Sequence, residues 1–409
     1  MPNFSIALTG LQADTVALNT IGNNLANLNT TAFKKQNVRF EDLFYQHIGT
    51  SGSADALQVG SGTRVSTTAT SFAQGSLATT QNSADMAISG NGFFLLQRGN
   101  RQSLSRAGDF QTDANGNLIS ASGESVMGFG ALNGVVQTNG KLVPLQIPVN
   151  SAESAQSTHN VSLTTSLDAS APAGTTFSSP VAVYDSLGRS HQASISFTKA
   201  SPTSWSYLIK LPAGDSTGTP VNNSGTLTFD ASGKLTSPSA NIAGVSFPNM
   251  ADGAADLTFS FNLFDQLNAP LTTQSAGASS TSSTSQDGFA AGSYESFAVD
   301  ANGVLSASFS NGHSARIGQV ALASVANVDG LARSGSNEYS ATEASGALAI
   351  GVSNDGGLGS IEGQALEQSN VDISAEFSDL IVAQRAFEAN SKTVTTFDTV
   401  TQTAISMIR

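Results

Sequence analysis

Both ends of this chain carry apolar side chains at helical spacing. In the first 30 residues, whose only charged side chain is Asp14, the residues Phe4, Leu11, Leu18 and Leu25 recur every seven positions. Leu8, Ile21 and Leu28 flank this row and widen it. The spacing predicts a helix of roughly 40 Å with one continuous apolar face.

The last 40 residues carry a longer row with alternating spacings of four and three, over about five heptads. Asp372 and Glu376 near its start and Arg409 at its end have the signs that a helix dipole favours, and Asn370 or Asp372 is placed to cap it. The row comprises Ile373, Phe377, Leu380, Gln384, Phe387, Ser391, Val394, Asp398, Thr401, Ile405 and Ile408.

These two helices have two interpretations. Most amphipathic helices pack on the core of their own chain. Chain termini, however, usually fray, and a domain seldom places its best apolar helices at both of them, which favours a role in joining subunits. The predicted assembly residues are Phe4, Leu8, Leu11, Leu18, Ile21, Leu25, Leu28, Ile373, Phe377, Leu380, Phe387, Val394, Ile405 and Ile408.

The composition indicates a class rather than a function. At 409 residues the chain is long enough for two or three domains, and its low charged fraction of 11% with 39 glycines is typical of secreted β-rich proteins. A net charge of −13 without a large basic cluster makes nucleic-acid binding an unlikely function. The sequence has no cysteine, no contiguous apolar region of a secretory signal and no run of 18 apolar residues, so we expect no disulfide, no cleaved signal and no membrane span.

From about Thr63 onward, short alternating runs separated by Gly, Asn and Asp predict β-hairpins. One turn unit recurs at 110–118, 229–235 and 297–305, where an Asp precedes a Gly by three residues. Asn and Gly tolerate positive φ, so the unit predicts a tight turn. A calcium loop is the alternative interpretation, but each unit supplies one carboxylate where such loops need several.

The predicted fold is mainly β, with paired, coiled-coil-like terminal helices that enclose two nested β-rich domains. Low complexity at 274–287 predicts a linker or flexible loop, and a Pro- and Ser-rich shift lies at 144–157. The expected parts are a terminal helical assembly domain (1–28 plus 370–409), a connecting segment (29–72 plus 356–369), an inner β domain (73–148 plus 291–355) and an inserted outer β domain (149–290).

Signals for catalysis are weak. The histidines His47, His159, His191 and His313 lie far apart, and no two have metal-ligand spacing. Gly214 to Gly218 has the letters of a nucleophile elbow around Ser216, but flanking prolines indicate a surface loop. We therefore predict no catalytic residue, no cofactor and no metal site.

Motifs at both ends resemble those of one protein family. Residues 21–27, Ile-Gly-Asn-Asn-Leu-Ala-Asn, and 30–34, Thr-Thr-Ala-Phe-Lys, resemble the N-terminal signature of the axial proteins of the bacterial flagellum, which form its rod, hook and hook–filament junction. Residues 369–372, Ser-Asn-Val-Asp, with Glu376 and residues 384–390, resemble the C-terminal signature. The signature residues are Asn23, Asn24, Ala26, Asn27, Phe33, Lys34, Ser369, Asn370, Val371, Asp372, Gln384 and Arg385.

The resemblance extends to residues 90–94 and 105–110, and one position departs from it, since Ala32 stands where the family usually has Gly. The inserted β region favours the hook type over the shorter distal rod type, and residues 183–191, 310–312 and 318–323 are also similar to hook segments. Distal rod or hook–filament junction proteins are the alternatives within the family. A secreted β-rich adhesin, or a hydrolase using Ser216, is the alternative outside it.

The resemblance implies a non-enzymatic subunit that polymerises into a curved, flexible tube, a universal joint between rod and filament. It implies that the terminal helices line an inner tube, that the first β domain forms a middle layer and that the inserted domain forms an outer layer. It also implies rod proteins, a hook cap, junction proteins and the type III export apparatus as partners, with localisation to the extracellular hook.

Overall fold

The computed structural model describes residues 4–50, 56–132 and 134–407. These fall into two compact units. The terminal unit comprises Met1–Val149, Phe297–Ala307 and Ala315–Arg409, and the inserted unit comprises Asn150–Ser296 and Ser308–Ser314. The four-part division expected from the sequence is finer than this and stays a prediction. Ile408 and Arg409 lie outside the described residues.

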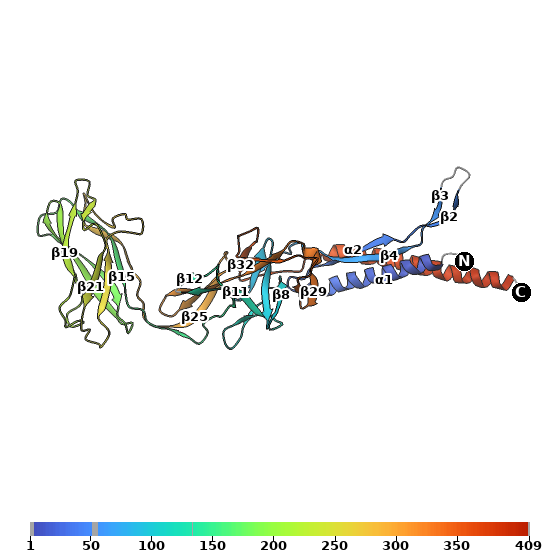
Figure 1. Cartoon of the computed structure of the whole chain (residues 1–409), viewed down its shortest axis with the longest axis horizontal. Coiled ribbons are helices and arrows are strands. Elements are labelled where there is room, and N and C mark those ends of the chain that lie inside the picture. Colours follow the sequence, from blue (N-terminus) through green and yellow to red (C-terminus); the bar gives the residue numbers. More distant parts are fainter. Residues whose placement is uncertain (1–3, 51–55, 133, 408–409) are drawn as a thin grey trace. The chain divides into compact units, whose positions relative to one another are not determined.

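Most of the described regular structure is β (Figure 1), with a helix near each end of the chain. The helical elements are α1 (Phe4–Ala26), η1 (Val328–Gly330) and α2 (Ile373–Met407). The strands before the inserted unit are β1 (Gln36–Asp42), β2 (Gln46–Thr50), β3 (Ala56–Val59), β4 (Thr63–Thr70), β5 (Leu77–Thr79), β6 (Met86–Ser89), β7 (Phe93–Arg98), β8 (Arg101–Ser105), β9 (Gln111–Thr112), β10 (Leu118–Ile119), β11 (Ser125–Leu132), β12 (Val135–Val136) and β13 (Leu142–Pro144).

The remaining strands lie within the inserted unit, span both units or follow the insertion. Those of the inserted unit are β14 (Ala152–Glu153), β15 (Asn160–Asp168), β16 (Thr176–Tyr184), β17 (Ser190–Ser201), β18 (Ser204–Lys210), β19 (Ser224–Phe229), β20 (Leu235–Ser237), β21 (Ile242–Phe247), β22 (Leu257–Asn262), β23 (Thr272–Ser275) and β24 (Ser280–Gln286). Three strands have residues in both units: β25 (Gly292–Val299), β26 (Val304–Phe309) and β27 (Ser314–Val320). Those that follow are β28 (Leu322–Val325), β29 (Ala332–Gly335), β30 (Glu338–Ser340), β31 (Leu348–Gly351), β32 (Ser360–Gly363) and β33 (Ala365–Glu367).

In the terminal unit, α1 and α2 pack side by side and antiparallel (Figure 1). The Asn24 amide donates to Glu376 Oε2 at 3.1 Å, and the Asn390 amide donates to Asp14 Oδ2 at 2.8 Å. Gly10 faces Asn390 so closely that a Cβ there would lie 2.7 Å from its amide nitrogen. The predicted pairing of the terminal helices, and the mainly β fold class, are therefore confirmed.

Strands from both sides of the insertion pair in the terminal unit. Its main sheet contains the order β27-β11-β7-β8-β30-β29, while β5 pairs with β33 and β6 pairs with β32. Phe93, Leu95, Leu104, Met127 and Tyr339 lie in one buried cluster of this unit. The chain thus closes the terminal unit only after the whole insertion has been synthesised.

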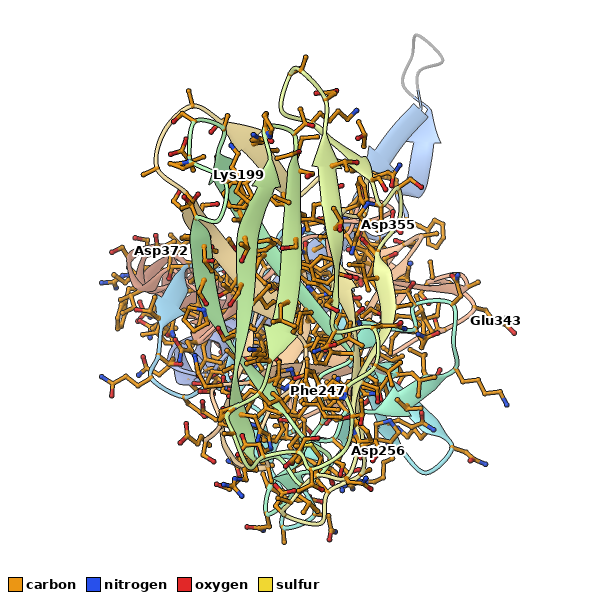
Figure 2. The ribbon with its side chains drawn as sticks, turned by 90° about the vertical axis from the view of Figure 1, so that its left-hand side faces the viewer. Lys199, Phe247, Asp256, Glu343, Asp355 and Asp372 are labelled. Atoms are coloured by element: carbon orange, nitrogen blue, oxygen red, sulfur yellow. The ribbon has the colours of Figure 1, made fainter. Side chains whose placement is uncertain are left out.

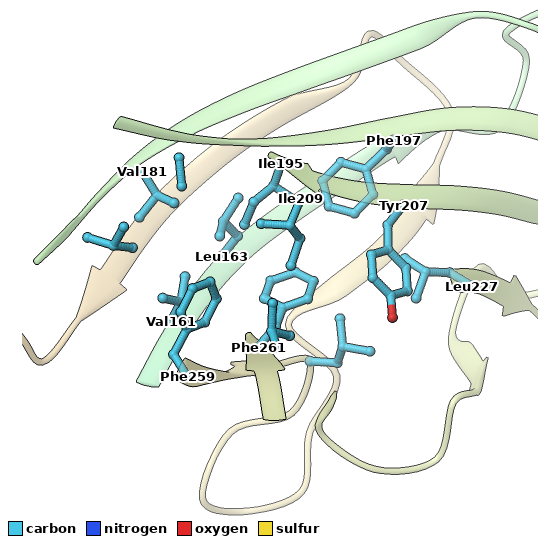
Figure 3. Packing of buried hydrophobic residues seen from close by; sticks show 14 of the residues in the cluster. Val161, Leu163, Val181, Ile195, Phe197, Tyr207, Ile209, Leu227, Phe259 and Phe261 are labelled. Atoms are coloured by element: carbon cyan, nitrogen blue, oxygen red, sulfur yellow. The ribbon is translucent and has the colours of Figure 1, made fainter. Parts of the chain in front are cut away.

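The inserted unit contains two sheets with a shared apolar core. One has the order β16-β17-β18-β19-β20; in the other, β21-β22-β15-β23, strand β24 also pairs with β15. Figure 3 shows side chains of both sheets meeting in this core. Its fully or almost fully buried members include Val161, Leu163, Val183, Ile195, Phe197, Trp205, Ile209, Leu227, Phe259 and Phe261.

Strand β17 shows how the sequence produces this core. Its burial alternates residue by residue, as a strand with one face on the core requires. The inward positions are His191, Ala193, Ile195, Phe197 and Lys199, so a titratable residue stands at each end of the apolar run. Lys199 Nζ donates to the carbonyl oxygens of Asp168 and Ala169, which satisfies that buried ammonium group.

The recurrent turn unit is confirmed. In each copy the Asp Oδ1 accepts the backbone N–H groups two and four residues later, which fixes a tight turn: Asp113 with Asn115 and Asn117, Asp230 with Ser232 and Lys234, and Asp300 with Asn302 and Val304. Asp185 and Asp265 make the same pair of bonds. One carboxylate therefore serves a structural role at each turn.

The linker predicted at 274–287 is wrong. Residues 280–286 form β24, which pairs antiparallel with β15 from Val161↔Gln286 to Ser166↔Ser280. Sheet pairing uses backbone groups, and Thr281 and Thr284 are β-branched, so a Ser/Thr run without Pro is compatible with an edge strand. Low complexity hid this strand because it lacks apolar alternation.

No described helix combines the length and the apolar character needed to cross a membrane.

Two glycines with similar positive φ angles provide a test of the inserted unit's packing. Gly174 has φ +88° and open space around it, whereas Gly233 has φ +79° and its added Cβ would lie 1.8 Å from the carbonyl oxygen of Gln274. We expect Gly174→Ala to cost about 1 kcal/mol, from the left-handed backbone alone. Gly233→Ala should cost at least about 2 kcal/mol more, because Gln274 must move. Equal urea midpoints for the two variants would contradict this packing.

Candidate assembly site

The N-terminal signature forms the end of α1 and the turn after it. Asn24 is buried, its Oδ1 accepts the backbone N–H of Gln36, and its amide donates to the Gln36 carbonyl oxygen and to Glu376. The Asn27 amide donates to the carbonyl oxygen of Asn23, and its Oδ1 accepts from Thr30 Oγ1. Asn24 therefore links α1, β1 and α2, while Asn23 and Asn27 close the helix end.

A buried ion cluster follows this turn. Lys34 Nζ lies 2.6 Å from Glu367 Oε1, and Arg106 Nη1 lies 3.5 Å from Glu367 Oε2. Glu367 Oε1 also accepts the backbone N–H of Gly75, and Lys34 also donates to the Ala73 carbonyl oxygen. Burial lowers the pKa of the Lys34 ammonium group below its ordinary value, against the opposing effect of Glu367. The cluster joins the segments after α1 and before α2 to the main sheet of the terminal unit.

Beside this cluster, Phe33 is buried under a cation. The Arg333 guanidinium lies 5.4 Å from the Phe33 ring centroid and donates to the Lys34 carbonyl oxygen. Ala32 is fully buried with φ +54°, and its N–H donates to the Glu367 carbonyl oxygen at 2.7 Å. The departure from the family pattern at Ala32 therefore falls on a left-handed backbone position, where Gly has no steric cost.

The C-terminal signature occupies the same region. The Asn370 side chain accepts the Lys35 N–H and donates to the carbonyl oxygens of Ser71 and Ala73. Val371 is buried, and its N–H donates to Ser369 Oγ. Asp372 caps α2, since its Oδ1 accepts the N–H groups of Ser374 and Ala375. Of the two caps considered from the sequence, Asp372 is thus the one used.

Gln384 and Arg385 are signature residues outside this region. Both are exposed on α2, and the Arg385 guanidinium pairs only with Glu388, three residues on, at 2.9 Å within the described part of the chain. A surface pair of this kind stabilises a helix by less than 1 kcal/mol or so. Gln384 and Arg385 therefore contribute little to the stability of the isolated chain.

The predicted apolar row of α1 is not its most buried face. Ala7, Ala13, Thr20 and Asn24 are buried, all of them small or polar. Leu8 is 42% exposed. The other row members with described side chains are half-buried: Leu11, Leu18, Ile21, Leu25 and Leu28. The side chain of Phe4 is outside the description, although its backbone begins α1.

The row on α2 is still more open. Among the described residues of α2, the one buried residue is Glu376, which is not a member of the row. Leu380, Ser391 and Val394 are half-buried in this row. Many large apolar side chains of α2 are exposed: Ile373 46%, Phe377 51%, Ile381 58%, Val382 68%, Phe387 37%, Val400 60%, Ile405 63% and Met407 77%. Ile408 lies outside the described residues. Since contact through small residues leaves the large ones uncovered, both helices present apolar surface.

A groove of about 360 Å³ lies between α1, β1 and α2 in this same unit. Ile21, Phe40 and Val382 contribute apolar side chains to it, and Asp14 and Asp379 contribute carboxylates. The sequence did not predict this groove. It assigned Phe40 to a connecting segment, whereas Phe40 lies on strand β1, which lines the groove beside the two helices.

The catalytic candidate Ser216 lies in a loop, as expected. Its Oγ donates to the Pro248 carbonyl oxygen at 2.6 Å. Its neighbour Asp215 bonds His191 Nδ1, within a cluster of His191 with aspartates that sequence spacing did not predict. The sequence signal that could have identified this cluster is the alternation of apolar and polar residues along β17, which places His191 on the inward face.

Four family models match this chain. They are the flagella basal body rod protein at residues 4–34, the flagellar hook protein FlgE/F/G D1 domain at 87–164, the flagellar basal body protein FlaE D2 domain at 154–289 and the flagellar basal body rod FlgEFG protein C-terminal region at 362–407. The flagellar hook protein FlgE of Borreliella burgdorferi is 33% identical to this chain, with 98% of each chain covered. The chain belongs to the flagellar hook protein family.

Other hook proteins give the same result. FlgE of Salmonella typhimurium is 32% identical over 99% of this chain and 100% of its own. The crystal structure of Helicobacter pylori FlgE2 matches with a TM-score of 0.54 at 16% identity, covering 71% of this chain and all of that one, which supports the fold alone. The assignment as a hook subunit is therefore supported over the rod, junction and adhesin alternatives, and places the chain in the flagellar hook.

The neighbours Asn23 and Asn24 allow a matched test of the signature. Asn24→Ala removes three hydrogen bonds at a buried position and leaves the Gln36 N–H without its partner, so we expect a loss of about 2–4 kcal/mol. Asn23→Ala, at an exposed position, should cost less than about 1 kcal/mol. Urea unfolding followed by the helical circular dichroism signal measures both, and equal losses would refute the proposed link.

At Ala32, in contrast, we expect a substitution that does not lower the stability of the protein. Ala32→Gly relieves about 1–2 kcal/mol of strain from the left-handed backbone. Two effects oppose this gain: one buried methyl group is lost, and the unfolded chain becomes more flexible. We expect it to leave the thermal midpoint unchanged or raise it. Ala87→Gly removes a methyl group just as buried but within strand β6, where Gly is unfavourable, and should lower the midpoint by several degrees. A comparable drop in both variants would contradict the strain at Ala32.

Proposed function

We propose that this chain polymerises through its two terminal helices into the curved, flexible tube of the hook and works there as a universal joint. The observation that carries the proposal is the row of exposed large apolar side chains along α2. Burying one such side chain contributes roughly 1.5–3 kcal/mol, so several together suffice for a stable subunit contact. A second copy of the chain is the partner argued for, since the relatives are hook proteins.

The assembly role of the α1 row is part of this proposal. Leu11, Leu18, Leu25 and Leu28 are only half-buried, so a neighbouring subunit gains by covering them. The exposed Gln384 and Arg385, which have no large role in the isolated chain, fit the same interface. We assign the signature around Asn24, Lys34 and Asn370 a different role, which is to hold α1 and α2 in place for assembly.

The inserted unit takes the outer, adaptable role in this proposal. Its strands place Ser and Thr on the solvent face, as at Ser178, Ser194 and Ser196, so contacts made there would be polar and wet. Such contacts rearrange at lower cost than an apolar helix interface. We also propose a structural rather than catalytic role, and assembly with rod, cap and junction proteins after type III export without a cleaved signal.

Electron microscopy of the purified protein under assembling conditions tests the proposal. Curved tubes support it, and persistent monomers contradict it.

Deletion of residues 1–28 or 370–409 should leave a folded β core that forms no tubes. A variant that lacks residues 149–290, with the two cut ends rejoined, should still form tubes, but with altered curvature. Complete failure of this variant to assemble would mean that the insert is part of the essential subunit contact.

Single substitutions separate assembly from folding. Phe377→Asp places a charge on a side chain that is already 51% exposed, so the thermal midpoint of the monomer should change little. In the tube the same charge must be buried, at a cost of several kcal/mol, so polymerisation and motility should be lost. Leu18→Asp should act in the same way. Ser378→Asp, at the neighbouring exposed position, is the control for added charge on the helix.

The proposal fails if Phe377→Asp polymerises normally, or if it lowers monomer stability by as much as a core substitution.

A further inference from the structure

His191 lies at one end of the core of the inserted unit, among three aspartates from separate turns. It is the first inward residue of β17, and both His191 and Asp185 are essentially buried. Asp185 comes from the turn before β17, Asp215 from the loop after β18 and Asp252 from the turn between β21 and β22. In Figure 2 the segment that carries Asp256, four residues after Asp252, lies at the end of the unit opposite Lys199.

Both imidazole nitrogens face carboxylate oxygens. His191 Nδ1 lies 2.7 Å from Asp215 Oδ2. His191 Nε2 lies 3.0 Å from Asp185 Oδ2 and 3.7 Å from Asp252 Oδ2, and these three atoms all lie within 4.8 Å of one another. A neutral imidazole has one N–H, so it cannot donate in both directions.

The aspartates are held so that one oxygen of each remains for the centre of the cluster. Asp185 Oδ1 accepts the N–H groups of Leu187 and Arg189, and Asp252 Oδ1 accepts the N–H of Ala254. Asp252 Oδ2 is a buried atom that accepts no hydrogen bond from any described residue. Its other cationic neighbour is the largely exposed Arg189, whose Nη1 is 3.8 Å away. The cluster therefore has a buried oxygen with unused acceptor capacity, aimed at His191 Nε2.

We propose that Asp185 Oδ2, His191 Nε2 and Asp252 Oδ2 bind one divalent transition-metal ion, with zinc as the best fit. Zinc takes imidazole nitrogen and carboxylate oxygen at about 2.0–2.2 Å, so tetrahedral ligand atoms stand roughly 3.3–3.5 Å apart. The two separations from His191 Nε2, 3.0 and 3.7 Å, bracket that value, and the ligand atoms of Asp185 and Asp252 lie within 4.8 Å of each other. A mixed set of one imidazole and two carboxylates favours zinc over calcium or magnesium, which prefer all-oxygen sites.

Asp215 is the positioning residue of this site. By accepting the Nδ1 proton it holds His191 in the tautomer whose Nε2 lone pair is free for a metal, the usual arrangement of a carboxylate behind a metal-bound histidine. The ion also relieves the charge imbalance, because three aspartates here face one imidazole and one exposed arginine. A bound ion ties together three turns of a chain that has no cysteine to cross-link them.

A proton competes with the metal for this site. Burial lowers the pKa of the His191 imidazole, but hydrogen bonds and the charges of Asp185 and Asp215 outweigh burial and raise it above its ordinary value. A metal ligand must be deprotonated, so zinc affinity should fall as the solution is acidified.

Equilibrium dialysis of the full chain tests the site. After treatment with chelator, the protein is dialysed against Zn²⁺, and bound metal is counted by elemental analysis. We expect one zinc per chain, a higher thermal midpoint with zinc than with chelator, and with Co²⁺ the visible absorption of a tetrahedral site. Asp252→Asn should weaken binding at least tenfold, Asp215→Asn by about 10–100-fold, and His191→Gln should abolish it.

The control is His159→Gln, which changes the exposed histidine of the same unit and should bind zinc as the unchanged chain does. If His191→Gln fails to fold, Asp252→Asn decides, because that residue is partly exposed and its replacement has the same size. Absence of stoichiometric zinc, or equal zinc uptake by Asp252→Asn and the unchanged chain, overturns the proposal. Acid stabilisation without zinc uptake also overturns it and assigns the cluster to a protonated imidazole.

Discussion

The buried ion pair between Lys34 and Glu367 is the constraint on which the terminal unit depends. It joins residues 333 positions apart, one shortly after α1 and the other shortly before α2, and Arg106 adds a second cation from the end of β8. Loss of the carboxylate would leave two buried cations facing each other without compensation, a change that costs several kcal/mol in proteins. Since loop-closure entropy rises only slowly with loop length, the long insertion adds little to the entropic cost of bringing these residues together.

Because that cluster and the Asn24 and Asn370 bonds fix the bases of both helices, α1 and α2 need little apolar contact with each other. Their approach uses Gly10 and polar pairs such as Asp14 with Asn390. The large apolar residues are then left for other surfaces. A monomer that buried Phe377 or Phe387 within itself would be more stable, but it would have little left with which to join a neighbour. Exposure of these residues is what the proposed assembly role of α2 requires.

The sequence predicted the elements that local pattern determines and missed those that depend on distant partners. The seven-residue spacing from Phe4 to Leu25 predicted α1, and the Asp-to-Gly turns predicted three hairpin turns. Strand β24 was missed because its Ser and Thr residues pair through backbone with β15, over 100 residues earlier. The role of the apolar rows remains a prediction, and the buried small face of α1 could not be derived, since no periodicity identifies which side of α1 packs most closely. The sequence did not predict the cluster around His191, because Asp215 and Asp252 come from loops that are distant in the sequence.

The inserted unit places a buried titratable residue at each end of the inward-facing run of β17. Phe197 and Ile195 occupy the middle of β17, while Lys199 closes one end and His191 the other. Strand ends are where hydrogen-bonded pairing stops, so a polar group that binds several turns there limits local opening. A joint that bends must let contacts between subunits change while each subunit keeps its shape. Domain stability is only about 5–15 kcal/mol in total, so the ion proposed at His191 would help the inserted unit to keep its shape while the contacts between subunits change.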